Sequence, residues 1–380
     1  MVLWPFKPLR DYPETLAWLT DVLRAKSAEQ RIAVRLAPRY TFVYQFLMSA
    51  SQFSRAQSMA RFLGSQSFYL PLWSDVAVFG AINSGVSVVP IDTRYADYRV
   101  GGQMVFWQSD TEYELCTIDA ITDSSITLSD PTTQSFSAAM VAPIVATQFA
   151  QTFEATRRGG RYIPTQVAFV STDAVDLSAD GGYTEYRGAQ VMTDRVRLLG
   201  NISERFEREN IKIDNDTGLI DQVALYDYSV KGSVMNWQPW TRPDLWALRQ
   251  WLHYCRGRQR GFWLPSWNND LQIAAPIASA DTAITVQAVG YPDFESVRDI
   301  MVESIAGVKT YLRIISGAAG AGNTELLTLS GAAGIDLSVG QVRRISYLTY
   351  MRNNADRIEI QHYAPGKATV SVPVIEAPAP

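Results

Sequence analysis

The feature that most constrains this chain is a short aromatic motif that occurs twice. The first copy, residues 68–75, reads Phe-Tyr-Leu-Pro-Leu-Trp-Ser-Asp, and the second, residues 262–269, reads Phe-Trp-Leu-Pro-Ser-Trp-Asn-Asn. Their prolines, Pro71 and Pro265, lie 194 positions apart (265 minus 71), which is about half of the 380 residues. Similarity at a fixed spacing is typical of a duplicated structural unit, so the flanks of the two copies are informative.

Both flanks repeat as well. Each motif follows a segment with helical periodicity that ends in a glycine-containing turn, at residues 54–62 and 245–254, and precedes a strand-like alternation, at residues 85–89 and 283–287. A second landmark, Tyr-Ala-Asp-Tyr at 95–98 against Tyr-Pro-Asp-Phe at 291–294, recurs at a spacing of 196 (291 minus 95). The two spacings differ by two residues, so the sequence predicts a tandem duplication with small insertions.

Composition limits the class of protein. With 47% apolar and 19% charged residues the chain is globular, and its 380 residues favour two or more domains. The net charge of −4 argues against a nucleic-acid-binding surface, which is normally basic. No run of about 18 apolar residues is present, and the N-terminus lacks the pattern of a signal peptide. We therefore expect a protein without membrane insertion that is made and folded in a cytoplasm.

The expected fold is mainly β, with sandwich or barrel units that each carry one short helix, and with a small barrel-like domain inserted in each repeat. Short strands separated by turn residues carry this prediction. The predicted division is listed in chain order: first β domain 1–75 plus 146–170, insert 76–145, linker 171–185, second β domain 186–268 plus 345–374, insert 269–344, flexible tail 375–380. The second repeat is thus expected to follow the order of the first.

Several local elements follow from the same patterns. Residues 14–23 fit either a short amphipathic helix or a strand, whereas 32–36 and 41–46 are expected to form a hairpin broken at Ala37-Pro38-Arg39. Helix 245–254 is expected to have Pro243 near its N-terminus after Thr241. The remaining predicted strands are 161–170, 219–228, 228–234, 300–302, 311–315, 325–329, 357–363 and 368–374, and 317–322 is predicted to be a flexible turn.

No catalytic, cofactor-binding or metal-binding residue is predicted, and we expect a protein that is not an enzyme. The only histidines, His253 and His362, are too few for a histidine metal cluster, and no Gly-x-Ser-x-Gly elbow accompanies them. They are expected to be ordinary packed or surface residues. Cys116 and Cys255 occupy unrelated places in the two repeats, so we expect buried free thiols in preference to a disulfide or a nucleophile.

One acidic segment and one glycine-rich segment resemble a calcium site and a phosphate-binding loop, respectively, but neither matches the spacing of such a site. Asp173, Asp176 and Asp180 lie in the linker, but their spacing differs from that of an EF-hand loop, so a solvated loop is favoured over a calcium site. Residues 317–322 lack the Lys-Ser/Thr ending of a phosphate-binding loop. Paired carboxylates such as glycosidases use are defined by geometry, and the sequence singles out none.

Tryptophans crowd one region of the second repeat. The six are Trp237, Trp240, Trp246, Trp251, Trp263 and Trp267. Aromatic residues are large and bury much area, so core packing accounts for most of them, while a subunit interface and a carbohydrate site remain alternatives.

A group of motifs resembles one family. The Trp4-Pro5 lead, the run 18–23 (Trp-Leu-Thr-Asp-Val-Leu), the run 29–35 (Glu-Gln-Arg-Ile-Ala-Val-Arg) and the helix followed by Leu-Pro-x-Trp are similar to the distal tail proteins of long-tailed bacteriophages. The turn at 257–262 (Gly-Arg-Gln-Arg-Gly-Phe) matches the family's Arg-Gly turn better than 64–68 does. The chain departs from the family in its duplication and in lacking a second Glu-Gln-Arg run.

The resemblance implies a structural virion protein of the tail tip, with the host cytoplasm as its place of assembly. It implies a homo-oligomeric ring in the baseplate that connects the tail tube to the hub around an open channel, with DNA only passing through. Implied partners are further copies of the chain, the tail tube protein, the tail hub, other baseplate proteins and the tape measure protein. If both repeats supply ring domains, three chains form a pseudo-sixfold ring; if only one does, six chains are needed.

Three further readings of the sequence stay open, one of them a tail-associated cell-wall hydrolase, which the lack of a histidine cluster disfavours. The chain could be the central tail hub, or a receptor- or glycan-binding module whose inserted domains expose aromatic residues. An acidic protein would also suit a channel wall that must not retain DNA, because phosphate is held by Lys and Arg.

Overall fold

The computed structural model describes residues 1–25, 28–150, 153–156, 161–177, 180–194, 204–207, 210–214, 216, 218, 220–224, 230–294 and 297–380. The described residues form 25 strands but only three α-helices, one of them four residues long. This confirms the prediction of a mainly β fold. No helix in the described part of the chain is long and apolar enough to cross a membrane.

The N-terminal half is built on a long hairpin and one helix. β1 (Tyr12–Arg24) pairs with β2 (Glu29–Ser49), and β2 leads directly into α1 (Ala50–Leu63). Ser49 caps α1 because its hydroxyl accepts from the Gln52 amide while the Gln52 side chain accepts from the Ser49 amide. The half is completed by β3 (Phe68–Pro71), β9 (Phe136–Phe149), β10 (Glu154–Ala155) and β11 (Tyr162–Ser171).

The C-terminal half is likewise built from one long helix and a set of strands. α2 (Arg242–Cys255) begins after Thr241, whose hydroxyl accepts from the Asp244 amide, with Pro243 in its first turn as predicted. The strands of this half are β12 (Glu185–Tyr186), β13 (Ala189–Gln190), β14 (Glu204–Glu207), β15 (Asn210–Ile213), β16 (Asp221–Ala224), β17 (Val230–Trp237), β18 (Gly261–Pro265), β23 (Val342–Asn353), β24 (Arg357–Ala364) and β25 (Lys367–Glu376).

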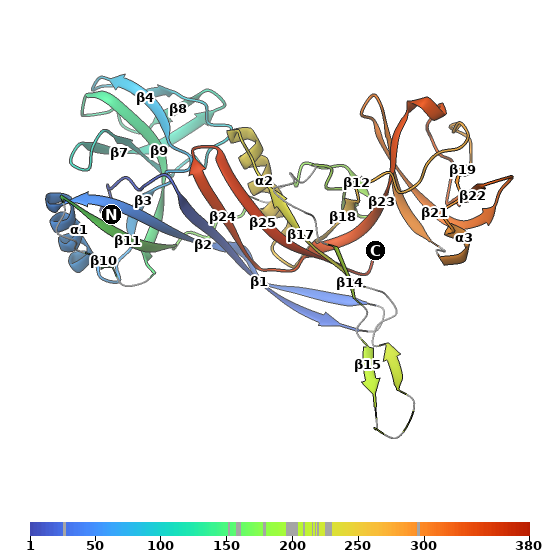
Figure 1. Cartoon of the computed structure of the whole chain (residues 1–380). Coiled ribbons are helices and arrows are strands. Elements are labelled where there is room, and N and C mark those ends of the chain that lie inside the picture. Colours follow the sequence, from blue (N-terminus) through green and yellow to red (C-terminus); the bar gives the residue numbers. More distant parts are fainter. Residues whose placement is uncertain are drawn as a thin grey trace.

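One antiparallel sheet runs through both halves (Figure 1). In the first half, β11 pairs with β9 and β10, then with β2, and β2 pairs with β1. In the second half, β25 pairs with β23 and β24, then with β17, and β17 pairs with β14. The order of pairing is therefore the same in both halves, and β1 joins them by pairing with β24.

The aromatic motifs occupy matching places in this order. Leu72 donates its amide to Pro143, and Ser266 donates to Tyr347, at the end of the β3–β9 and β18–β23 pairs. A lead-in segment runs parallel to each motif strand: the Trp4 amide donates to Tyr69 at 2.8 Å, and the Met192 amide donates to Trp263 at 2.9 Å. The shared order agrees with the duplication inferred from sequence, although common descent of the halves stays a prediction.

Each half carries an inserted β domain with its own core (Figure 1). The first contains β4 (Ala77–Ile82), β5 (Val88–Pro90), β6 (Gln103–Trp107), β7 (Tyr113–Thr122) and β8 (Ser125–Leu128). The second contains β19 (Ala283–Gln287), α3 (Tyr291–Phe294), β20 (Arg298–Ser304), β21 (Lys309–Ala319), β22 (Thr324–Leu329) and a 3-10 turn at Val339–Gln341. β9 and β23 belong both to an insert and to the central sheet, so the boundaries predicted at 145 and 344 fall inside strands.

Some local predictions are wrong. Residues 32–36 and 41–46 are not a hairpin, because β2 runs unbroken from Glu29 to Ser49 and takes β1 as its partner. The strand is not broken at Pro38. A proline cannot donate a ladder hydrogen bond, and β2 tolerates it because Pro38 has no partner among the β1–β2 pairs and lies beside a shift in register. Residues 14–23, which fitted helix or strand, belong to β1.

Other corrections concern the C-terminal half. The tail predicted at 375–380 begins inside β25, and the Ala377 amide donates to Tyr350, so its first residues are packed. The flexible turn predicted at 317–322 is shorter, because β21 extends to Ala319. The second landmark forms a bend at 95–98 but the helix α3 at 291–294. Of the strand predictions at 219–228 and 228–234, β16 and β17 are confirmed, and residues 219 and 225–229 lie outside the described residues.

Candidate functional site

The two halves meet at a junction that we define by β1 from the first half and by β24 and α2 from the second. β1 and β24 pair antiparallel from Tyr12 opposite His362 to Ala17 opposite Arg357. Leu16 and Trp18 of β1 pack into the core that lies under α2, together with Leu245 and Ile358. The junction therefore combines a strand ladder with a shared hydrophobic core.

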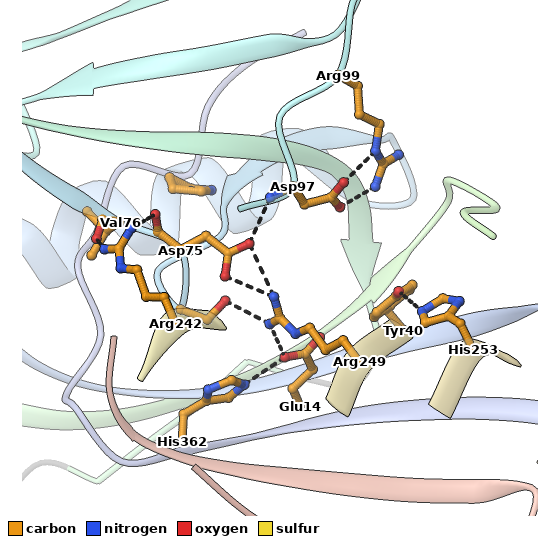
Figure 2. A network of polar contacts seen from close by, with 12 residues as sticks. Glu14, Tyr40, Asp75, Val76, Asp97, Arg99, Arg242, Arg249, His253 and His362 are labelled. Carbon is orange, nitrogen blue, oxygen red and sulfur yellow. Dashed lines mark hydrogen bonds and ion pairs between the residues drawn. The ribbon is translucent and has the colours of Figure 1, made fainter. Parts of the chain in front are cut away.

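An ion network spans this junction, with Arg249 of α2 at its centre (Figure 2). Its Nη1 donates to both oxygens of Asp75, at 2.9 and 3.2 Å, and its Nη2 donates to Glu14 Oε2 at 2.7 Å and to Ser74 Oγ at 3.1 Å. All four residues are buried, with between 2% and 6% of each residue exposed. One guanidinium from the second half thus satisfies two buried carboxylates from the first.

Glu14 has a second partner across the junction. His362 Nε2 lies 2.6 Å from Glu14 Oε2. Burial of Glu14 opposes its ionisation, but Arg249 and the hydrogen bond from His362 outweigh burial and lower its pKa to about 2. The carboxylate is therefore ionised at neutral pH and only accepts, so His362 Nε2 carries the proton and donates it.

The loop that follows the first aromatic motif is fixed from both sides. Asp75 accepts not only from Arg249 but also from the Asp97 backbone amide, at 3.1 Å. Arg242, at the start of α2, donates to the backbone carbonyl of Val76, and Arg99 binds the Asp97 carboxylate. The end of the motif in the first half is thereby attached to α2 of the second.

A second contact joins Tyr40 of β2 to His253 of α2 (Figure 2). Tyr40 Oη lies 2.7 Å from His253 Nε2, and the Leu177 amide donates to His253 Nδ1 at 3.2 Å. Since Nδ1 accepts, the proton lies on Nε2, which donates to Tyr40. Burial lowers the pKa of His253 to about 4, so the ring is neutral at physiological pH.

The far end of the hairpin carries one more ion pair to the second half, between Glu29 and Arg352, and hydrogen bonds between the Thr20 backbone and the Arg258–Asp356 pair of that half. Glu29 binds Arg352 of β23 through both carboxylate oxygens, at 2.6 and 3.0 Å, and burial of Glu29 is outweighed by this contact, so its pKa is lowered. Asp356 accepts from the Thr20 amide and from Arg258. The Glu-Gln-Arg stretch singled out by sequence thus contributes its glutamate to the junction.

The cavity beside the ion network is too small for a substrate. The cavity between Glu14, Tyr40, Leu72, Asp97 and Trp246 has a volume of about 20 Å³, which is close to that needed for one water molecule. Every charged side chain around it is engaged with another protein group. The arrangement is suited to holding two structural units together and offers no room for a reacting molecule.

The candidates considered from sequence lie in unrelated places. Cys116 and Cys255 are buried and free, as predicted, and burial raises the pKa of both thiols, that of Cys116 to about 12. Asp176 pairs with Arg256, Asp173 accepts from the Ala146 amide of β9, and Asp180 accepts from the Gly182 amide. Among the residues that the structure describes, no group of three or more His, Cys, Asp or Glu is placed to hold a metal ion.

Core packing accounts for half of the tryptophan cluster. Trp237, Trp251 and Trp263 are buried, with 6%, 0% and 1% of each exposed, as core packing predicts. Trp246 lies against the cavity of the junction, and Trp240 is 45% exposed beneath the ammonium group of Lys367. The tryptophans therefore do not line one common site.

Sequence reasoning missed the three charged residues at the centre of the junction, although a signal was present. Arg249 lies four residues after Leu245 and three before Leu252, which places it on the apolar face of the predicted helix. Glu14 alternates with Tyr12 and Leu16, both of which point inwards. A charge on an apolar face is buried against a partner, and the partner only becomes evident in the tertiary structure.

Comparison with known proteins adds no family assignment. No protein-family model matches this chain, and no curated protein is significantly similar to it.

Proposed function

We propose that this chain is a structural subunit of the tail tip of a long-tailed bacteriophage, of the distal tail or baseplate ring type. In this role, copies of the chain form a ring that connects the tail tube to the hub around an open channel through which DNA passes. Its neighbours are further copies of itself, the tail tube protein, the hub and other baseplate proteins. The protein assembles in the host cytoplasm and remains in the virion tail tip.

The observation that carries this proposal is the arrangement of two equivalent β units side by side in one sheet. The strand order of the first half recurs in the second, and the units are joined edge to edge by β1 and β24. Repeating such a join generates a ring when the rotation between units closes, and an open filament when it does not. Supporting the structural role, the buried charges at the join bind each other and leave a cavity of only about 20 Å³.

The mass and shape of the purified protein test the proposal. Since one chain has a mass of 42.3 kDa, three chains give about 127 kDa and six give about 254 kDa by light scattering. Negative-stain images of the same fraction should show a ring with an open centre. Three chains are expected, because both halves supply a unit of the ring.

A particle without a central opening at these masses contradicts the proposal. DNA retention by the ring that disappears at high salt contradicts the idea of a non-adhesive channel, because such retention reports phosphate contacts by Lys and Arg.

A further inference from the structure

At the two ends of the central sheet, β10 and β14 each have one partner strand among the described residues, and we call their other edges open. These open edges correspond to the two edges joined inside the chain. At the join, β1 uses one edge for β2 and the other for β24. Its counterpart β14 has β17 as its only described partner, and β10, the counterpart of β24, has only β11. β10 lies near α1 at one end of the molecule and β14 lies towards the other (Figure 1). An open edge strand is a template for pairing with another strand.

The strand pairings show which residues of the first half correspond to which residues of the second half. Pro71 pairs with Ile144 and Pro265 with Leu348, so the repeated motif aligns β9 with β23. Five residues further along these strands, Phe149 and Asn353 occupy equivalent positions, and they pair with Phe169 and Val374. The next ladders bring Phe169 opposite Phe42 and Val374 opposite Ser233. Phe42 of β2 and Ser233 of β17 are therefore equivalent, and both are buried.

Following the ladder pairs outwards in the same way identifies the equivalent residues on both open edges. Glu14 pairs with Phe42 and Glu204 pairs with Ser233, so Glu204 of β14 is the counterpart of Glu14. On the other edge, Thr165 and Val370 lie four residues before Phe169 and Val374, and they pair with Ala155 and Ile360. Ala155 of β10 is therefore the counterpart of Ile360. Within the chain, Glu14 stands directly opposite Ile360.

We infer that β14 of one copy adds antiparallel to β10 of the next copy, with Glu204 opposite Ala155. The occupant of each open edge is thus a second copy of this chain, joined head to tail, and the inference rests on the proposed ring function. This register places Arg205 opposite Glu154, which corresponds to Thr15 opposite Glu359 inside the chain. It places Phe206 opposite Phe153, which corresponds to Leu16 opposite Ile358.

The side chains at these positions are complementary. Arg205 and Glu154 carry charges of opposite sign, and both side chains are exposed. Residues of opposite charge that face each other across two antiparallel strands stabilise the pairing. Phe206 is 66% exposed, whereas its counterpart Leu16 is fully buried in the join. Phe153 already packs against Trp4 and Phe53, so Phe206 would extend an existing aromatic cluster.

The loop after each aromatic motif gives independent support. Asp75 in the first half is 3% exposed because it is held by α2. Asn269 lies at the equivalent position, 194 residues later, and is exposed. Helix α2 covers Asp75, but no described element covers Asn269 in the same way. This difference is expected if a neighbouring copy covers Asn269 in the assembly.

Engineered disulfides test this register directly. One full-length protein carries Arg205→Cys and another carries Glu154→Cys, and they are mixed and oxidised in air. Because Cys116 and Cys255 are buried, they do not compete. The expected product is a disulfide-linked pair that forms only in the mixture. In the matched control, the Arg205→Cys protein is mixed with a Thr156→Cys protein, whose cysteine is exposed but lies two residues out of register. This mixture should form markedly less disulfide-linked pair.

Charge reversal tests the same pair without a covalent bond. Arg205→Glu and Glu154→Arg should each weaken self-association about fivefold per join, and the double variant should restore it. Both positions are exposed, so the fold is expected to remain intact, which circular dichroism checks. Sedimentation velocity measures the association.

The outcomes separate this inference from the ring itself. Rings in negative stain with no disulfide in register, or with no effect of charge reversal, overturn the inference and leave the proposed function standing. Efficient disulfides in open filaments support the join but contradict the ring. A protein that stays monomeric at all concentrations and forms neither disulfide counts against both.

Discussion

Replacing Arg249 by Met is the most informative perturbation of the junction. Methionine has a similar length and fills the space, but it removes every hydrogen bond that Arg249 donates to Glu14, Asp75 and Ser74. Two carboxylates, 2% and 3% exposed, then lose their shared cation. Removing one partner of a buried ion pair costs about 3–5 kcal/mol, because the remaining charge stays buried without compensation. We expect Arg249→Met to destabilise the protein by an amount in this range.

Urea unfolding followed by tryptophan fluorescence measures the effect, since Trp251 lies fully buried on the same helix. With a urea dependence of about 3 kcal/mol per molar, a loss of 3 kcal/mol lowers the midpoint by about 1 M. The control is Arg94→Met, which removes an exposed pair with Asp92 and should leave the midpoint unchanged.

Adding Glu14→Gln and Asp75→Asn to Arg249→Met should recover most of the loss, because no charge is then left without a partner. If Arg249→Met unfolds at the same urea concentration as Arg94→Met, the ion network does not hold the halves together.

The remaining predictions concern pH and thiol reactivity. The pKa of Glu14 is lowered from 4.5 to about 2, so the stability it contributes is present above pH 4.5 and is lost as the pH falls towards 2; Glu14→Gln should flatten the stability profile in that range. The pKa of His253 is lowered from 6.5 to about 4, so the unfolded chain binds its proton first and stability falls between pH 6.5 and 4; a profile of His253→Gln that keeps the same slope there would refute this. Cys116 and Cys255 should resist iodoacetamide at pH 8 in the native protein and react fully in urea, as mass spectrometry would show, since both are buried and their pKa values are raised.

Much of the secondary structure followed from local patterns. The start of α2 was predicted because Thr241 and Pro243 are local signals next to a periodic apolar run, whereas α1 begins at Ala50, four residues before the predicted segment 54–62. The strands at 300–302, 311–315, 325–329, 357–363 and 368–374 are confirmed, and each is a short apolar or alternating run, which is a local signal of a strand. The hairpin predicted at 32–46 was wrong because β2 pairs with residues 14–24, and the choice of partner is not encoded in the local alternation.

The junction shows the limit of the same reasoning. Glu14, Asp75, Arg249 and His362 are separated by between 61 and 348 residues, and nothing in their individual surroundings indicates that they meet. The sequence suggested only that the histidines would be packed or at the surface. The structure buries both, and gives each a partner from the other half of the chain.

By itself the sequence determined that the chain is mainly β, where helix α2 begins, and that an aromatic motif recurs with a half-chain spacing, because these depend on short-range periodicity and composition. Only the tertiary structure decided that the two halves pair their strands in the same order, that β1 joins β24, and that β10 and β14 each keep one edge without a partner in the described part of the chain. Strand partnership depends on burial of whole faces and on hydrogen bonds between residues far apart in the chain, so it is fixed only when the complete sheet has formed.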